Sequence, residues 1–176
     1  MARDDKKPGP AKFPAGYYMR AYEGENKTED ALGWCRCCAG GSLGIEEISE
    51  AAFENKMLND KTVDPANIYF LISPLGDIAG TVTYQYTKAE DTGCIHMVAV
   101  EKNYRGKKLA LPMLLYAVDK ILGDGRKKII LSTDDWRLPA VKTYLKAGFV
   151  PVIKHGDAEM AARWADVMDK INIKKE

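Results

Sequence analysis

The stretch from residue 95 to residue 151 constrains the fold most, because its pattern changes repeatedly between strand and helix. It reads as a strand, a basic turn that contains glycine, a helix, a strand, a second helix and a last strand. Arg105-Gly106 allows a tight turn, since glycine adopts backbone conformations that other residues avoid. A helix that follows such a turn exposes the unpaired N–H groups of its first turn and a partial positive charge. The sequence therefore predicts a phosphate-binding turn over residues 105 to 110.

Hydrophobic periodicity and turn residues divide the rest of the chain into strands and helices. The expected strands cover residues 17–22, 68–73, 78–86, 94–100, 128–132 and 149–153, and the expected helices cover residues 28–38, 49–57, 107–122, 139–147 and 157–171. An antiparallel first half thus meets a strand–helix–strand–helix–strand second half, which predicts an α+β, or mixed α/β, fold. Strands that splay apart where the two halves meet would admit a ligand.

The ends of the chain differ from this central pattern. Residues 1–15 are rich in charge, proline and glycine, which predicts a loose N-terminal tail, and residues 16–176 are expected to form a single domain. The helix over residues 157–171 places Met160, Trp164 and Val167 on one face. It would cover a sheet edge, build a homodimer contact, or lie on the surface as a charged helix.

Composition argues against several classes of partner. Apolar residues make up 46% of the chain and charged residues 29%, and the net charge is +1. Such a balance gives no overall attraction to nucleic acid or to an anionic membrane, so neither is expected as a partner. The chain has no apolar run near the about 20 residues that a membrane span needs, and residues 1–10 lack the apolar core of a secretory signal. We expect a cytoplasmic protein.

The cysteines do not predict a metal site. Cys35, Cys37, Cys38 and Cys94 should be reduced thiols in a cytosolic protein. The spacing of the first three is not that of a zinc site, and no second Cys/His pair follows at a useful distance. We interpret them as small buried residues of one helix and expect no metal.

The basic turn resembles the phosphate motif of the GNAT superfamily of N-acyltransferases, Gln/Arg-x-x-Gly-x-Gly/Ala. Residues 105–110 match this motif at Arg105 and Ala110 but have Lys108 where the family has glycine. Lys108 still supplies a backbone N–H, and its ammonium group would either favour phosphate or crowd it. Pro112 removes another N–H close to the start of the helix.

A second segment, residues 131–149, resembles the family's Asn-x-x-Ala-x-x-x-Tyr-x-x-x-Gly-Phe pattern. Ala140, Tyr144 and Gly148-Phe149 agree with it, and Arg137 replaces the asparagine. Two matches in the family's order are far more specific than either alone. The resemblance covers residues 17–153 as an order of elements and is specific over residues 94–151.

This resemblance implies a GNAT-like fold, with a mostly antiparallel sheet splayed at its middle, flanking helices and an additional C-terminal helix. It also implies acetyl-CoA as a cosubstrate. The backbone of Val98, Ala99 and Val100 would pair with the pantetheine arm as an added strand does. The residues expected to hold the pyrophosphate are Arg105, Gly106, Lys107, Lys108, Leu109 and Ala110. Arg137 would reach the cofactor or contact an acidic substrate.

The resemblance further implies transfer of an acetyl group to an amine, which needs an acid for the leaving thiolate and a base for the amine. Tyr144 occupies the family's general-acid position, although its ring could instead simply pack in the core. His96 is the candidate base, directly or through water, because imidazole titrates near neutral pH. Strand alternation predicts His96 on the same face as Cys94 and Val98. A structural or solvent-facing histidine is the alternative.

Other residues near the motifs leave the acceptor open. Asp134 and Asp135 follow a parallel strand, where they would steer a cationic amine or cap the next helix. A covalent intermediate on Cys94 is not expected, because direct transfer needs no nucleophile. The residues that would line an acceptor pocket, or else form core, are Trp34, Phe53, Met57, Tyr84 and Tyr86.

The sequence leaves three hypotheses for function. The first is an N-acetyltransferase acting by direct transfer on a small-molecule or peptide amine, a class that includes amino acids, aminoglycosides and protein amino groups. The alternative is a catalytically inactive CoA- or acyl-CoA-binding regulatory module. The third is a protein-interaction domain that uses the basic turn to bind an acidic partner. Replacement of Tyr144 by Phe separates the first two, since it should sharply lower turnover in the first case and leave binding in both.

Overall fold

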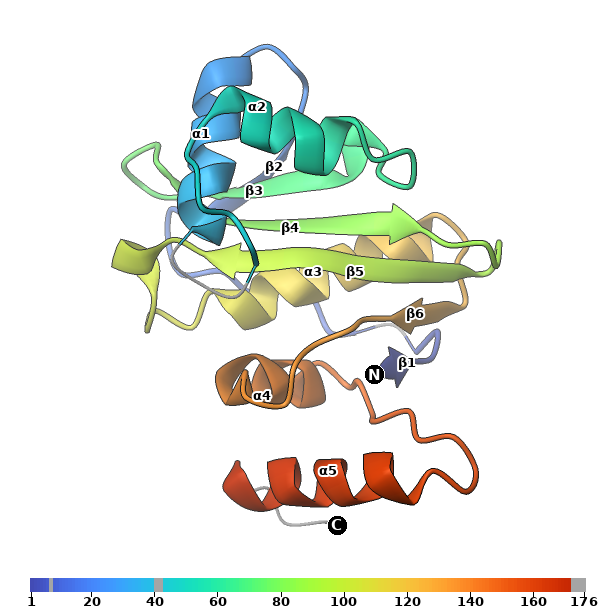
Figure 1. Ribbon diagram of the computed structural model, residues 1–176. Helices are drawn as coiled ribbons and strands as arrows, with labels where there is room; N and C mark the ends of the chain where they lie inside the picture. The colour runs from blue at the N-terminus through green and yellow to red at the C-terminus, as the bar shows by residue number, and fades with distance from the viewer. Residues whose placement is uncertain (7, 40–42, 172–176) are drawn as a thin grey trace.

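A six-stranded sheet, flanked by helices, organises the residues that the computed structural model describes, which are 1–6, 8–39 and 43–171 (Figure 1). The strands are β1 (Ala2–Arg3), β2 (Tyr18–Ala21), β3 (Ile68–Ile72), β4 (Ile78–Tyr86), β5 (Thr92–Val100) and β6 (Lys128–Ile130). The helices are α1 (Lys27–Cys38), α2 (Glu50–Phe53), α3 (Ala110–Gly123), α4 (Leu138–Lys146) and α5 (Ala158–Lys170), with a π-helical turn at Glu54–Leu58 and 3₁₀ turns at Pro65–Asn67 and Lys102–Tyr104.

The strands lie in the order β1-β6-β5-β4-β3-β2, and neighbours are antiparallel except for the parallel pair β5 and β6. All of β3 is buried, as are residues 78–84 of β4, because helices cover both faces of the sheet. One core layer joins α3 and α4 to the sheet through residues such as Met113 and Tyr144. The other joins α1 and α2 through Trp34 and Phe53. This architecture confirms the predicted α+β fold.

The sheet splays between β5 and β6. Within the described residues, β5 pairs with β6 only at Thr92, Gly93 and Cys94, so its remaining length has no strand on that side. On its other side, the register with β4 shifts so that Met97 and Val98 together face one residue. Met97 has φ of 50°, which marks a β-bulge, and bulges bend and twist a strand. The bulge thus lies three residues beyond Cys94, the last residue of β5 that pairs with β6.

The first residues of the chain and the segment near residue 150 meet at the outer edge of β6. The sequence predicts a loose tail over residues 1–15, but Ala2 and Arg3 pair with β6 as strand β1, so this prediction is wrong for these residues. The predicted strand over residues 149–153 is also wrong, because Val150 forms only an isolated bridge with Ala2. The first residues of the chain thus lie between β6 and the segment expected to form the last strand.

Helix α5 packs against α4 on the outside of the molecule, as Figure 1 shows. Val167 of α5 and Ile171, which follows the helix directly, meet Val141 of α4 in a separate apolar cluster. Asp157 caps the helix by accepting a hydrogen bond from the Met160 N–H at 2.9 Å. None of the helices in the described part of the chain combines the length and the apolar character that crossing a membrane requires.

Candidate active site

A cavity of about 590 Å³ opens beside the part of β5 that has left β6. This volume lies within the range of small-molecule and cofactor sites. The lining residues are Cys37, Cys38, Leu43, Val98, Ala99, Val100, Tyr104, Arg105, Gly106, Lys108, Leu109, Ala110, Trp136, Arg137, Pro139, Ala140, Thr143 and Tyr144. The cavity therefore brings both sequence motifs to one place.

The strand wall of the cavity consists of Val98, Ala99 and Val100. Val98 and Val100 pack toward α3, whereas Ala99 packs toward α1. A strand edge without a partner presents backbone N–H and C=O groups that an extended ligand can pair with. The Val100 carbonyl also accepts a hydrogen bond from Arg105 Nε at 3.1 Å, which ties the basic turn to the end of the strand.

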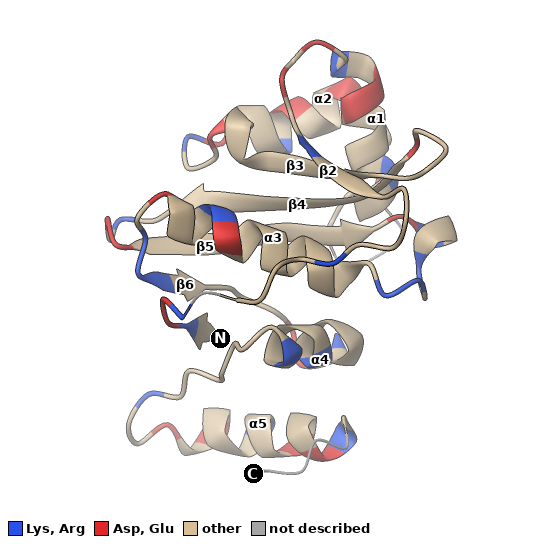
Figure 2. Cartoon of the chain, turned by 180° about the vertical axis from the view of Figure 1, so that it is seen from behind, with Lys and Arg blue, Asp and Glu red and all other residues tan. Residues whose placement is uncertain are grey.

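The basic turn has the backbone of an anion-binding loop. Gly106 and Lys108 both adopt positive φ, 80° and 59° respectively, and turns of this kind can direct several N–H groups toward one anion. Lys108 therefore keeps a glycine-like backbone although it carries a side chain, at a cost of roughly 1–2 kcal/mol. Figure 2 shows Lys and Arg residues in this turn between β5 and α3. The departure from the family motif changes the side chain and leaves the turn intact.

The side chain of Lys107 points away from the cavity, unlike those of Arg105 and Lys108. It does not line the cavity, and its ammonium nitrogen lies 4.6 Å from the centre of the Tyr104 ring. It lines a separate groove of about 760 Å³ beside the β3–β4 turn. Its side chain is therefore not placed to hold a ligand in the cavity, although its backbone belongs to the turn.

Helix α3 begins at Ala110, three residues later than the predicted start at residue 107. The turn consequently lies before the helix, and Leu109 and Ala110 form the junction at the cavity wall. Pro112 falls in the first helical turn, where its missing N–H has no intrahelical acceptor to lose. The helix N-terminus therefore faces the cavity undisturbed.

Tyr144 lies on α4, in the core layer that also contains α3, and lines the cavity. It is 7% exposed and packs edge-on against Phe149, with ring centres 6.3 Å apart. Burial raises the pKa of the Tyr144 phenol, and the Arg137 guanidinium opposes this increase. The phenol is therefore protonated at neutral pH and can donate its proton or a hydrogen bond.

Arg137 precedes α4 and lines the same cavity. Its Nε lies 3.2 Å from Asp134 Oδ2, and its guanidinium carbon lies 5.4 Å from the centre of the Trp136 ring. The guanidinium is thus held between a carboxylate and an aromatic ring. Since Arg105, Lys108 and Arg137 are the charged residues among the described lining residues, the cavity is cationic and suited to phosphate.

His96 is not brought to the cavity. Ile95 packs toward α3, so alternation places His96 on the face of α1 and α2, and the bulge keeps Met97 on that face while Val98 turns toward α3. The prediction that His96 and Val98 share a face is wrong, because the bulge interrupts the alternation. Burial lowers the pKa of His96, with the Asp60 carboxylate opposing, so the imidazole is neutral at pH 7.

The sequence analysis did not identify several of the residues that line the cavity. Cys37 and Cys38 form an apolar wall, since burial raises the pKa of Cys37 to about 12 and also raises the pKa of Cys38. Their burial confirms the interpretation of α1 cysteines as small core residues. Trp136 is 67% exposed at the cavity and adjoins the motif at Arg137, which is the one sequence signal that pointed to it. The aromatic candidates for an acceptor pocket do not line this cavity, and four of them are core: Trp34, Phe53, Met57 and Tyr84.

Sequence comparison agrees with these two motifs. Residues 29–149 match the family model described as "Acetyltransferase (GNAT) family". The mycothiol acetyltransferase of Corynebacterium aurimucosum is 32% identical over 100 residues, which cover 52% of this chain and 33% of that protein. The chain thus spans a minor part of that relative's length.

Solved structures share the fold. The GCN5-related N-acetyltransferase from Sphaerobacter thermophilus superposes with a TM-score of 0.67 at 22% identity, over 84% of this chain and 45% of that chain. A chain of the NatC complex bound to Gag peptide and CoA gives a TM-score of 0.61 at 22% identity, over 78% of this chain and 86% of that chain. At these identities the likeness concerns the fold, and it confirms the predicted GNAT-like architecture.

Proposed function

Because the chain belongs to the GNAT acetyltransferase family, we propose that it transfers an acetyl group from acetyl-CoA to an amine by direct attack. One observation carries the proposal: the free edge of β5, the basic turn and the Tyr144 phenol line a single cavity. In this proposal each wall has one task, which is to pair with pantetheine, hold pyrophosphate or supply a proton. The CoA bound to the NatC neighbour is consistent with this assignment.

Cofactor binding would use the backbone more than the side chains. The N–H groups of residues 105–110 would bind the pyrophosphate, with Arg105 and Lys108 adding positive charge. The edge of β5 from Val98 to Val100 would pair with the amides of the pantetheine arm. Arg137, in the place of the family's asparagine, would contribute a further cation to the same ligand.

Tyr144 would act as the general acid. The amine nitrogen attacks the acetyl carbonyl carbon, the carbon–sulfur bond breaks, and the departing sulfur takes the phenolic proton while the amine loses one of its own. A raised pKa keeps the phenol protonated until the thiolate leaves. Arg137 would stabilise the phenolate that forms, since its positive charge opposes the rise in the Tyr144 pKa.

The amine's proton would leave through water, with His96 as the proposed acceptor. His96 lies off the cavity and is neutral at pH 7, so a water molecule must connect the two. His96→Gln should then lower kcat and leave the CoA dissociation constant unchanged. A full kcat in this variant would remove His96 from the mechanism.

The acceptor does not follow from the charge of the cavity. The charged residues among the described lining residues, Arg105, Lys108 and Arg137, are all assigned to CoA in this proposal, so they do not select among neutral, anionic and cationic amines. Neighbours of this fold include, by name, a glucosamine-6-phosphate N-acetyltransferase and a ribosomal-protein-S18-alanine N-acetyltransferase. Small-molecule and peptide amines both remain within the proposal.

The test separates binding from turnover. CoA at 100 times its dissociation constant should stabilise the protein by about 2.7 kcal/mol, which thermal unfolding detects. Thiol release from acetyl-CoA across a panel of neutral, acidic and polycationic amines then measures turnover, and Tyr144→Phe should lower kcat about 100-fold or more while binding persists. Tyr18→Phe is the matched control, because Tyr18 is 56% exposed on β2 and does not line the cavity.

Two other results would redirect the proposal. CoA binding without turnover of any amine, in wild type and Tyr144→Phe alike, would favour the regulatory module. Absence of CoA binding would remove the acetyltransferase proposal altogether.

A further inference from the structure

We propose that Arg163 of α5 is a positioning residue for the cofactor, acting through Asp135 on the segment that carries Trp136 and Arg137. The inference rests on the proposed function, because it assigns the Arg137 side chain to the cofactor cavity. It gives the C-terminal helix a part in cofactor binding although no residue of α5 lines that cavity.

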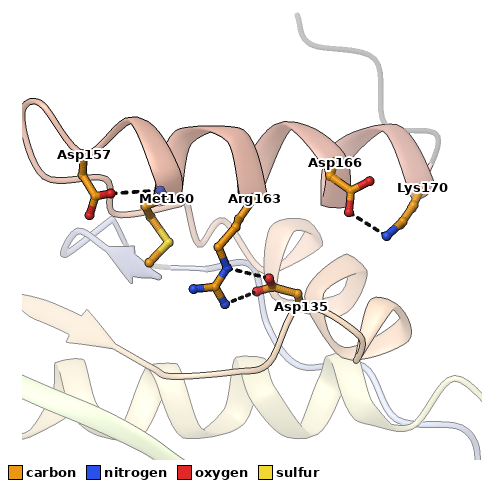
Figure 3. Close-up of polar contacts among 6 residues, drawn as sticks. All are labelled: Asp135, Asp157, Met160, Arg163, Asp166 and Lys170. Carbon is orange, nitrogen blue, oxygen red and sulfur yellow. Dashed lines mark hydrogen bonds and ion pairs between the residues drawn. The ribbon is translucent and has the colours of Figure 1, made fainter.

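The contact between Arg163 and Asp135 joins segments far apart in the sequence. Arg163 Nε donates to Asp135 Oδ2 at 2.8 Å, and Nη2 donates to Oδ1 at 3.1 Å. Figure 3 shows this two-point contact between the guanidinium and the carboxylate, reaching from α5 to the loop that precedes α4. Paired hydrogen bonds of this kind fix the direction of a carboxylate as well as its distance. Asp135 is therefore held in one orientation by the helix.

The loop transmits that orientation to the cavity over two residues. The Arg137 N–H donates to the Asp134 carbonyl at 3.1 Å, and Arg137 Nε lies 3.2 Å from the Asp134 carboxylate. Trp136 follows Asp135 directly, and both Trp136 and Arg137 line the cavity. Asp134 thus stabilises this short turn through contacts with Arg137 inside the loop, and Arg163 stabilises it through Asp135 from the neighbouring helix. A change in the direction of Asp135 should move both lining residues.

Attachment of α5 does not depend on this ion pair. Val167 and Ile171 pack with Val141 of α4, and Trp164 adds to the same cluster. Loss of the Arg163 side chain should therefore leave the helix docked and release only the loop. The pair is also exposed, at 48% for Arg163 and 45% for Asp135, so it adds little to global stability. Its consequence should consequently appear in ligand binding.

The same helix provides a matched control. Lys170 Nζ lies 2.6 Å from Asp166 Oδ2, four residues earlier on α5, and both side chains are exposed to a similar degree. This pair joins the helix to itself and touches no residue of the loop (Figure 3). Lys170→Ala removes a cation and an ion pair from α5 without changing the link to Asp135.

The first measurement is calorimetric titration of the full chain with CoA. Arg163→Ala and Asp135→Asn should each weaken binding by about three- to fivefold, the range that one exposed ion pair supports. The double variant should be no weaker than either single variant, because both remove the same contact. Arg163→Lys should restore part of the affinity, since it keeps the charge and loses the two-point geometry. Lys170→Ala should match wild type.

The second measurement needs no ligand. Hydrogen exchange of the loop amides over residues 133–137 should speed up in Arg163→Ala and stay unchanged in Lys170→Ala. Unchanged loop exchange, or equal CoA affinity in wild type and Arg163→Ala, would overturn the positioning role. If wild type itself fails to bind CoA while the loop exchange responds as expected, the proposed function fails and Arg163 keeps only a role in loop order.

Discussion

Lys108 offers a direct test of whether the backbone of the turn binds the cofactor. Its φ of 59° lies in the left-handed region, which disfavours side chains and disfavours β-branched ones most. A left-handed residue other than glycine costs about 1–3 kcal/mol. Lys108 already bears part of this cost, and a β-branched residue lies at its upper end, so Lys108→Val should lose roughly 1–2 kcal/mol in free energy of unfolding, measured by urea titration. Lys108→Gly should stay near wild type, because relief of the strain offsets the greater freedom of glycine in the unfolded chain.

Cofactor affinity should separate the two variants further. The strain can appear only once: if the free Lys108→Val turn relaxes out of the left-handed conformation, its loss of stability disappears, and the roughly 1–2 kcal/mol is met on binding as a CoA dissociation constant about 5–30 times higher. Lys108→Gly loses only one exposed charge, so it should bind about threefold more weakly at low salt and equally well at high salt. Lys107→Val is the control, because Lys107 is adjacent, has no positive φ and does not line the cavity.

Two results would refute this reasoning. Equal stability and equal CoA affinity in Lys108→Val and Lys107→Val would show that the left-handed conformation has no role. Tighter binding by Lys108→Gly at low salt would show that the lysine side chain crowds the phosphate.

Three further variants test the packing and the titration of the core. A Cβ atom at Gly80 would lie 2.9 Å from the Ala99 carbonyl oxygen, so Gly80→Ala should cost roughly 1–3 kcal/mol of stability in urea unfolding and should disturb β5. Arg20→Met leaves the fully buried Asp30 carboxylate without its two hydrogen bonds, at 3.1 and 2.5 Å, and should cost roughly 2–3 kcal/mol, less than a fully buried pair because Arg20 is 27% exposed. Burial lowers the pKa of His96 below 6.5, so the unfolded chain binds its proton first and stability falls as pH drops below that value. His96→Gln should flatten this fall, measured by unfolding at about pH 7.5 and 5.5.

Local patterns predicted those parts of the fold that local interactions determine. The bounds of β3, β4 and α5 agree with the sequence to within a residue or two, since alternation, helical spacing and the Asp157 cap all act over short separations. Ser49, the first residue of the expected second helix, caps α2 by accepting the hydrogen bond of the Ala52 N–H at 3.1 Å. The turn before α3 was predictable for the same reason, because Gly106, with φ of 80°, marks it directly.

The wrong predictions have two causes. Either two distant segments compete for one place in the sheet, or the backbone departs from the two-residue alternation of a strand. Nothing near residue 150 shows that Ala2 and Arg3 take the place beside β6. The bulge at Met97 contains no glycine, so no residue type indicates the positive φ there. This bulge places His96 and Val98 on opposite faces of the sheet. Both features depend on tertiary packing, which cannot be predicted from the hydrophobic periodicity of the sequence.

The loss of pairing along β5 explains why the cavity has a strand wall. β6 ends at Ile130, opposite Cys94, so the pairing stops there, three residues before the bend at Met97. The backbone edge at Val98 to Val100 therefore has no neighbouring strand on that side among the described residues. The strand then leads directly into the turn at Gly106, so a ligand that pairs with the edge meets the cationic groups at its end. The proposed strand pairing and the proposed phosphate binding would thus be parts of one site, because β5 loses its neighbouring strand partway along its length.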